Sequence, residues 1–521
     1  MSLAERKPVS PWVIAPVVAI AAFMEVLDIS IANVALLHVA GGLSATQDEA
    51  TWVLTSYTVA NAIVLPISGW LSNVVGRKRF FMFCIVGFTL TSLACGLAPS
   101  LGTLIVFRAL QGITGGGLQP SSQAILSDAF PPAKRGMAFA LYGIAVVFAP
   151  AIGPTLGGWI TDHFSWRWVF LINLPVGLIL LPLVHALVRD PQHMIDARKA
   201  RKGQKNRMDY IGFSFLLVGL GALQIMLDRG QQDDWWSSNF IVVMTALAIV
   251  GLIAFVVWEW YDKDPIVDIH LFRDRNFAVS NLFMAILGFV LLASTAVLPL
   301  YVQSLMGYTA TQAGLVLTPG GIAIICLMPV VGRLVTKVQT RYLIGFGFFV
   351  SGVGLYTMTG FNLQADYNTI MLARVLQASA LGFLFIPINT AAYDGLPMEK
   401  SSNASAIINL SRNVGGSIGI SLATTLLARR SQFHQSHLAE NTSPYNPAFQ
   451  DNLHQIGQAT ASDPGGLLAH GILYRDLLNQ ASMLGYLDVF KFMAVLFLCM
   501  VPLVFIIRRG VSGTGAPAGA H

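Results

Sequence analysis

Long apolar runs separated by short polar breaks extend along almost the whole chain. A bilayer core of about 30 Å needs about 20 helical residues, so each run is long enough to cross a membrane as a helix. The pattern therefore predicts an all-α polytopic membrane protein. Cutting the sequence at its polar breaks gives fourteen spans: 12–38, 50–71, 80–99, 102–126, 135–161, 166–188, 209–228, 239–261, 277–303, 312–336, 341–360, 367–393, 402–428 and 485–508.

The loops between the spans differ in charge from one side to the other. The connector RDPQHMIDARKARKGQKNR (189–207) holds seven Lys or Arg residues, and the loop HVAGGLSATQDEA (38–50) on the opposite side holds none. Loops rich in Lys and Arg stay in the cytoplasm. The pattern predicts that both termini are cytoplasmic, which an even number of spans satisfies.

Composition supports a membrane protein and excludes a nucleic-acid-binding one. The chain is 55% hydrophobic and 11% charged, whereas a soluble domain has about 25% charged residues. The net charge of +6 resides in short loops and needs no nucleic-acid partner. One polar connector, 429–484, lies on the non-cytoplasmic side. Its histidines are irregularly spaced, so we expect no metal site and an ordered or semi-ordered external loop, which could serve as a docking surface for a partner.

The sequence contains an internal repeat. FRALQG (107–112) recurs as ARVLQA (373–378), which aligns Arg108 with Arg374, 266 positions later. Two parallel halves of similar hydropathy are a recurrent transporter architecture. We therefore expect a 6+2+6 arrangement with three parts: an N-terminal six-helix half (1–188), a basic connector with two inserted spans (189–261) and a C-terminal six-helix half (262–521).

Two acidic residues interrupt the first apolar run, in FMEVLDISIANVAL (23–36). A charged residue inside a membrane is costly and marks a functional site by default. Asp28 lies near mid-membrane and is the leading candidate for a proton-exchanging acid; a structural hydrogen bond is the alternative. Glu25 lies one turn earlier on nearly the same face, where the two acids would titrate as a coupled pair; the alternative is a residue that only lines water.

Arginines within predicted spans are the expected partners of these acids. Arg108 lies inside FRALQGITGGG and should face the protein interior, unless it reaches back to an interface. Arg412, in the thirteenth predicted span, is a second residue that could modulate the acids.

The loop GWLSNVVGRKR (69–79) resembles the major facilitator signature between spans 2 and 3. Asn73 replaces the acid of that signature, so a gate pair built on that acid is not expected. The basic residues would cap helix ends and pair with acids across a cytoplasmic gate. The candidate gating residues here are Gly69, Gly76, Arg77 and Lys78.

The fifth predicted span carries APAIGPTLGGWI (149–160), which resembles the antiporter motif that marks exporters. Small residues four apart allow two helices to touch, and prolines bend a helix. Such a helix suits rocking between two states. The candidate conformational residues are Gly153, Pro154, Gly157 and Gly158.

LDISIANVAL (27–36) resembles the first-span signature of the drug:proton antiporter family with fourteen spans, of the EmrB/QacA type. Asp28 and Asn33 match that signature, and WRWVFLINLP (166–175) also matches this group. The R-x-x-Q-G pattern at Arg108 resembles the family motif associated with proton transfer. Further residues that could modulate the site are Arg374, Arg412 and Asn33.

The resemblance implies the major facilitator fold and proton-driven export of hydrophobic drugs or other toxic compounds across the bacterial inner membrane by alternating access. It also implies an EmrA-like periplasmic adaptor, a TolC-like outer-membrane channel and no cofactor besides the coupling protons. The alternative is export of one physiological metabolite, such as a fatty acid or siderophore. We expect no enzyme activity, and the chain lacks the G-x-x-x-x-G-K-[ST] loop of ATP-driven pumps.

Overall fold

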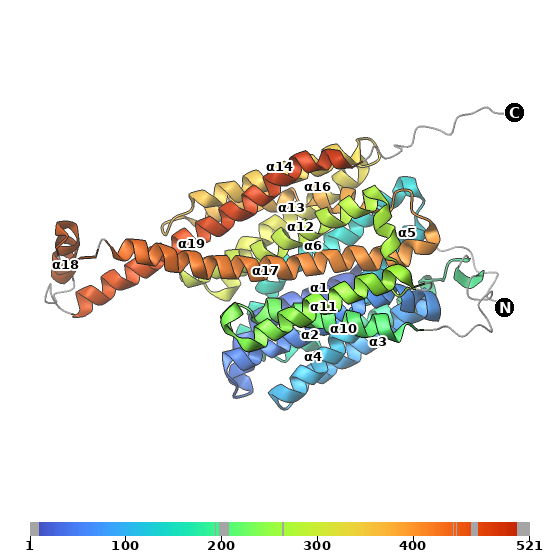
Figure 1. Cartoon of the computed structure of the whole chain (residues 1–521), viewed down its shortest axis with the longest axis horizontal. Helices are drawn as coiled ribbons and strands as arrows, with labels where there is room; N and C mark the ends of the chain where they lie inside the picture. Colours follow the sequence, from blue (N-terminus) through green and yellow to red (C-terminus); the bar gives the residue numbers. More distant parts are fainter. Residues whose placement is uncertain are drawn as a thin grey trace.

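The computed structural model describes residues 10–192, 194–196, 208–262, 265–440, 442–443, 445–459 and 467–507. Within these ranges every regular element is an α-helix or a short 3-10 helix. Most of the long helices run roughly along the long axis of the molecule (Figure 1). The protein is therefore all-helical, as the hydropathy pattern predicts.

The first helices form what we call the N-terminal half. The fourth predicted span folds as two helices that meet at Gly116, where a side chain would approach the carbonyl oxygen of Asn61 at 3.0 Å. The helices of this half are α1 (Pro11–Gly42), α2 (Gln47–Val75), α3 (Arg77–Gly96), α4 (Leu101–Gly115), α5 (Leu118–Ala129), α6 (Pro132–His163), α7 (Trp168–Leu171) and α8 (Asn173–Leu187).

Two helices, α10 (Tyr210–Arg229) and α11 (Asn239–Tyr261), follow and pack against each other. The remaining helices form the C-terminal half. They are α12 (Arg275–Ser304), α13 (Ala310–Leu334), α14 (Thr340–Thr357), α15 (Tyr367–Ser379), α16 (Gly382–Ala392), α17 (Ser401–Ala439), α18 (Pro447–Ala459) and α19 (Leu467–Leu503).

Thirteen stretches of the described residues are long and apolar enough to cross a membrane, which makes this a multi-pass membrane protein. The predicted span 402–428 is not among them, although it lies within the continuous helix α17. This helix is too polar on average because it buries side chains such as Ser405, Asn409 and Arg412 inside the protein. It packs against α2, α12 and α19.

The segment 429–484 is largely helical where it is described, because α17 continues to Ala439, α18 follows and α19 begins at Leu467. The C-terminal end of α17 and the N-terminal end of α19 project beyond the other helices, and α18 lies at the far tip (Figure 1). Most of the basic connector 189–207 and both chain termini, on which the predicted sidedness depends, lie outside the described residues.

The two halves meet along two seams. On one, α6 packs against α13 and α16; on the other, α17 packs against α2 and α5. Helix α10 lies beside the second seam and contacts both α2 and α17. Most of the candidate functional residues lie inside the N-terminal half or at these seams, and Arg374 lies on α15 inside the C-terminal half.

Candidate functional site

Asp28 on α1 is fully buried in a polar cluster contributed by three helices. Arg108 on α4 donates from Nη1 to Oδ2 at 2.6 Å. The amides of Gln111 on α4 and Asn173 on α8 donate to Oδ1 at 3.1 and 2.7 Å. Both carboxylate oxygens therefore have partners, and one of those partners is a buried cation.

Arg108 is only 1% exposed and does not reach an interface. Its Nη1 also donates to Gln111 Oε1 at 2.8 Å, and its Nε donates to the Val53 carbonyl at 3.2 Å. The guanidinium carbon lies 4.2 Å from the ring centroid of Tyr57. Because the guanidinium of Arg108 is buried away from water, its positive charge needs the negative charge of Asp28. Removing only one partner of a buried ion pair destabilises a protein far more than replacing both.

Glu25 is also fully buried, but it has a different set of partners. Asn61 on α2 donates to Oε1 at 2.9 Å, and Oε2 has no hydrogen-bond partner among the described residues. The charge of Arg412 on α17 attracts the carboxyl group. Both acids of α1 therefore accept hydrogen bonds within the N-terminal half, and Glu25 is in addition attracted by the charge of Arg412 in the other half.

Amide side chains on α5 bridge the two halves near Glu25. Gln123 donates to Asn389 on α16 at 2.6 Å and accepts from Asn409 on α17 at 2.7 Å. Arg412 donates to Gln119, one turn earlier on α5. This part of the seam is therefore a buried hydrogen-bonded network with one cation in it.

A second charged cluster closes one end of the α5–α17 seam. Arg77, at the start of α3, forms an ion pair with Asp128 on α5. It also donates across the seam to the hydroxyls of Ser401 and Ser402 on α17 at 3.2 and 2.6 Å. Ser401 in turn donates to Asp128 at 3.0 Å. Three hydrogen bonds to charged groups therefore join the halves at this point, which we call the gate cluster.

The other residues of the predicted gating loop support this cluster. A side chain at Gly69 would meet the backbone of α17 at 3.0 Å, so this glycine permits close approach of the halves. Gly76 joins α2 to α3 with a φ of 100°, a left-handed conformation that favours glycine. Lys78 donates to the His185 carbonyl at 2.5 Å and therefore ties α3 to the end of α8.

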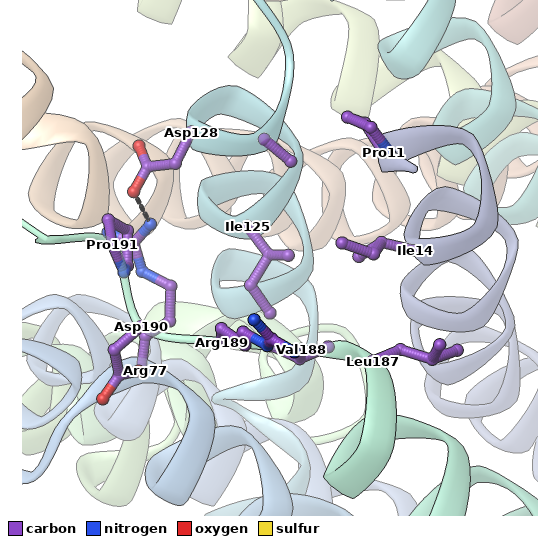
Figure 2. Close-up of a pocket in the computed structure, with 11 residues that line it drawn as sticks. Pro11, Ile14, Arg77, Ile125, Asp128, Leu187, Val188, Arg189, Asp190 and Pro191 are labelled. Atoms are coloured by element: carbon purple, nitrogen blue, oxygen red, sulfur yellow. Dashed lines mark hydrogen bonds and ion pairs between the residues drawn. The ribbon is translucent and has the colours of Figure 1, made fainter. Parts of the chain in front are cut away.

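A cavity of about 280 Å³ lies beside the gate cluster. Figure 2 shows the Arg77–Asp128 pair at its edge. Apolar side chains of α1, α5 and the end of α8, together with the charged residues Arg189 and Asp190, form the rest of the wall. The pair is thus next to open space on one side and covered by α17 on the other. The apolar residues that line the cavity include Pro11, Ile14, Ile125, Leu187 and Val188.

The glycines of α6 allow very close contact with α1. A side chain at Gly153 would overlap that of Ser30, and one at Gly157 would lie 3.2 Å from Ile31. Ser30 donates to the Pro150 carbonyl at 3.4 Å, an oxygen in the proline-containing part of α6. The small residues therefore pack α6 against α1, as the motif predicts physically.

The remaining predicted residues lie in different environments. Pro154 is half-buried, Gly158 is buried, and Asn33 is exposed, away from the buried acids. Arg374 on α15 is buried and donates to Ser294 on α12 at 2.9 Å. The structure thus separates Asn33 and Arg374 from the Asp28 cluster.

The geometry described so far is that of a helical transporter: two packed halves, a charge pair buried inside one of them and a charged closure between them. The chain belongs to the Major Facilitator Superfamily, whose family profile matches residues 18–420. It is similar to the "Multidrug export protein EmrB" of Escherichia coli (strain K12), at 37% identity over 96% of each chain. It is also similar to the "Fatty acid resistance protein FarB" of Neisseria gonorrhoeae, at 36% identity over 94% of each chain.

A solved structure of the proton:xylose symporter XylE, 13% identical, aligns with a TM-score of 0.55 over 95% of this chain and 96% of that one. At this identity the likeness concerns the fold alone. It agrees with the all-helical architecture.

Several partners of the predicted residues were not among the candidates expected from the sequence. One of them is Asp128, a carboxylate close to the end of an apolar run. Asn61, Asn173 and Gln123 are amides inside apolar runs, and that is the signal which could have identified them. Buried amides need partners, so each one marks a polar contact inside the bundle.

Proposed function

We propose that this protein is a proton-driven antiporter that exports hydrophobic drugs or other toxic compounds across the bacterial inner membrane. The observation that carries the proposal is the buried Asp28–Arg108 pair, in a chain 37% identical to a multidrug export protein. We further propose that α17 is the fourteenth span, in a 6+2+6 arrangement with both termini in the cytoplasm. Helix α17 is continuous and long enough, with 39 residues, to cross a bilayer.

In this mechanism a proton added to Asp28 removes the negative charge that Arg108 requires. The guanidinium would then be a buried cation without its counter-ion, which is strongly unfavourable. The N-terminal half can relieve this cost by rearranging α1 against α4, or by releasing the proton again. Proton binding would in this way favour one conformation over another, as alternating access requires.

The gate cluster and α6 would supply the conformational change. Opening at the gate cluster would require Arg77 and Asp128 to separate from Ser401 and Ser402. The seam of α6 with α13 and α16 would be the surface on which the two halves rock. Glycines at the α6–α13 seam support this role. A side chain at Gly314 would overlap the Thr155 backbone and one at Gly136 would overlap Val335, so the halves touch there without bulky side chains interlocking.

We also propose that the protein works with a periplasmic adaptor and an outer-membrane channel. The projecting ends of α17 and α19, with α18 at the tip, offer a surface beyond the bundle for such an adaptor (Figure 1). A second candidate function is export of a single physiological compound such as a fatty acid. The similarity to a fatty acid resistance protein favours it.

The test is proton-linked transport in sealed vesicles, with wild type compared to Asp28→Asn. The variant keeps the shape of the side chain but cannot exchange a proton. We expect gradient-driven accumulation of a fluorescent drug to be lost, while exchange of labelled for unlabelled drug without a gradient continues. Unchanged gradient-driven accumulation in Asp28→Asn would contradict proton coupling at this residue. Transport of fatty acids but not of unrelated drugs would favour the second function.

A further inference from the structure

The C-terminal half contains a copy of the Arg108 site that lacks the acid. Arg374 and Gln377 stand 266 positions after Arg108 and Gln111, and the same shift carries Asp28 to Ser294. The repeat thus aligns a serine with the proposed proton-carrying carboxylate.

The contacts follow the same correspondence. Arg374 Nη1 donates to Gln377 Oε1 at 2.5 Å and to Ser294 Oγ at 2.9 Å. In the N-terminal half, Arg108 Nη1 makes the equivalent two bonds, to Gln111 and to the Asp28 carboxylate. The two sites are therefore related in geometry as well as in sequence.

Two donors lack partners at the place where the acid is missing. Among the described residues, Arg374 Nε and Gln377 Nε2 have no hydrogen-bond partner. In the other half, Gln111 Nε2 donates to Asp28 at 3.1 Å. The unpaired amide of Gln377 thus corresponds to one that binds a carboxylate.

The charge is also uncompensated. Arg374 is 2% exposed, and no carboxylate of the described residues forms an ion pair with it. The cost of a buried cation is large unless an anion and hydrogen-bond acceptors accompany it. Ser294 lies on α12 between buried apolar residues such as Leu291 and Val297. An anion carried on an apolar body would therefore suit this environment better than a fully hydrated one.

We propose that Arg374, Gln377 and Ser294 form a binding site for the carboxylate of an amphipathic organic anion. The guanidinium and the Gln377 amide would donate to the carboxylate, in the place that Asp28 takes in the other half. This inference deepens the proposed export function and rests on it, because the transport cycle would supply the route by which the ligand enters. By the repeat, α12 and α15 are the counterparts of α1 and α4, which carry the Asp28–Arg108 pair.

The test uses the full chain in lipid nanodiscs without a proton gradient. Binding of octanoate is measured by isothermal titration calorimetry, with octyltrimethylammonium and octan-1-ol as probes of the same chain length, and with chloride as a small anion. Arg374→Gln removes the charge. Ser294→Asp supplies a tethered carboxylate, and Ser294→Asn is its uncharged control of nearly the same size.

We expect octanoate to bind wild type and Ser294→Asn, and to bind Arg374→Gln and Ser294→Asp at least about tenfold more weakly, the effect of one charge-assisted hydrogen bond. Equal octanoate affinity in wild type, Arg374→Gln and Ser294→Asp would overturn the proposal. The proposal would also be overturned if octyltrimethylammonium or octan-1-ol bound wild type as tightly as octanoate, or if chloride bound and octanoate did not. Because no gradient is used, failure of proton coupling at Asp28 would leave the binding result unchanged, and the two proposals fail separately.

Discussion

The gate cluster gives a prediction whose size follows from its hydrogen bonds. Three bonds to charged groups cross the seam: two from Arg77 to Ser401 and Ser402, and one from Ser401 to Asp128. The double substitution Ser401→Ala with Ser402→Ala removes all three and leaves the Arg77–Asp128 pair in place. In the open state water would replace the lost bonds, so we count only about 1 kcal/mol for each.

The closed state should therefore lose about 3 kcal/mol relative to the open one, which changes the population ratio by a factor of roughly 150. Spin labels at the exposed positions Arg79 and Glu399, on either side of the cluster, would report the separation of the halves by pulsed electron resonance. The exposed Cys326 and Cys499 are first replaced by Ser to prevent unwanted labelling. We expect the double variant to shift the distance distribution towards longer values.

Ser405→Ala is the matched control, because Ser405 lies on the same helix, is fully buried and donates only to carbonyls of α17 itself. It should leave the distance distribution unaltered. The reasoning is refuted if the double variant keeps the wild-type distribution, or if the control shifts it equally.

Three further predictions concern single positions. Gly314→Leu should reduce vesicle transport at least about tenfold, because a side chain there would overlap the Thr155 backbone across the α6–α13 seam. The control Gly345→Leu should keep wild-type transport, because a side chain at Gly345 would meet open space. Glu25→Gln should raise the midpoint of thermal unfolding, because glutamine still accepts from Asn61 and no longer buries a charge with one unpartnered oxygen; a lower midpoint would contradict this. Gly76→Ala should lower stability to denaturant by about 1–2 kcal/mol because φ is 100°; wild-type stability would show that this conformation is not required.

The spans and the buried charges were predictable because both stand out locally. An apolar run of about 20 residues leaves few alternatives to a membrane helix. A carboxylate or guanidinium within such a run must be buried in protein or meet water. That reasoning predicts burial of Asp28, Glu25 and Arg108, and all three side chains are buried; for Asp28 and Arg108 the family resemblance adds to it.

The pairings could not be predicted, because they join residues far apart in sequence. Asn73 stands where the family signature has an acid, so no gate pair built on that acid is expected. The structure pairs Arg77 with a different carboxylate, that of Asp128 on α5, 51 positions later. The neutral network around Gln123 was missed because an amide inside an apolar run is less conspicuous than a charge. Helix α17 also departs from the apolar pattern because its polar side chains are satisfied by other helices.

Helix α17 has a mechanical consequence. Its 39 residues give a length of about 58 Å, roughly twice the thickness of the hydrocarbon core. It begins at the gate cluster and ends in the projecting tip beside α18 (Figure 1). If the C-terminal half tilts by about 10° around the middle of the bilayer, a rigid α17 moves its tip sideways by about 7 Å. The helix is thus a lever that converts the small opening of the gate into a larger stroke about 58 Å away, where a partner protein could detect which way the transporter faces.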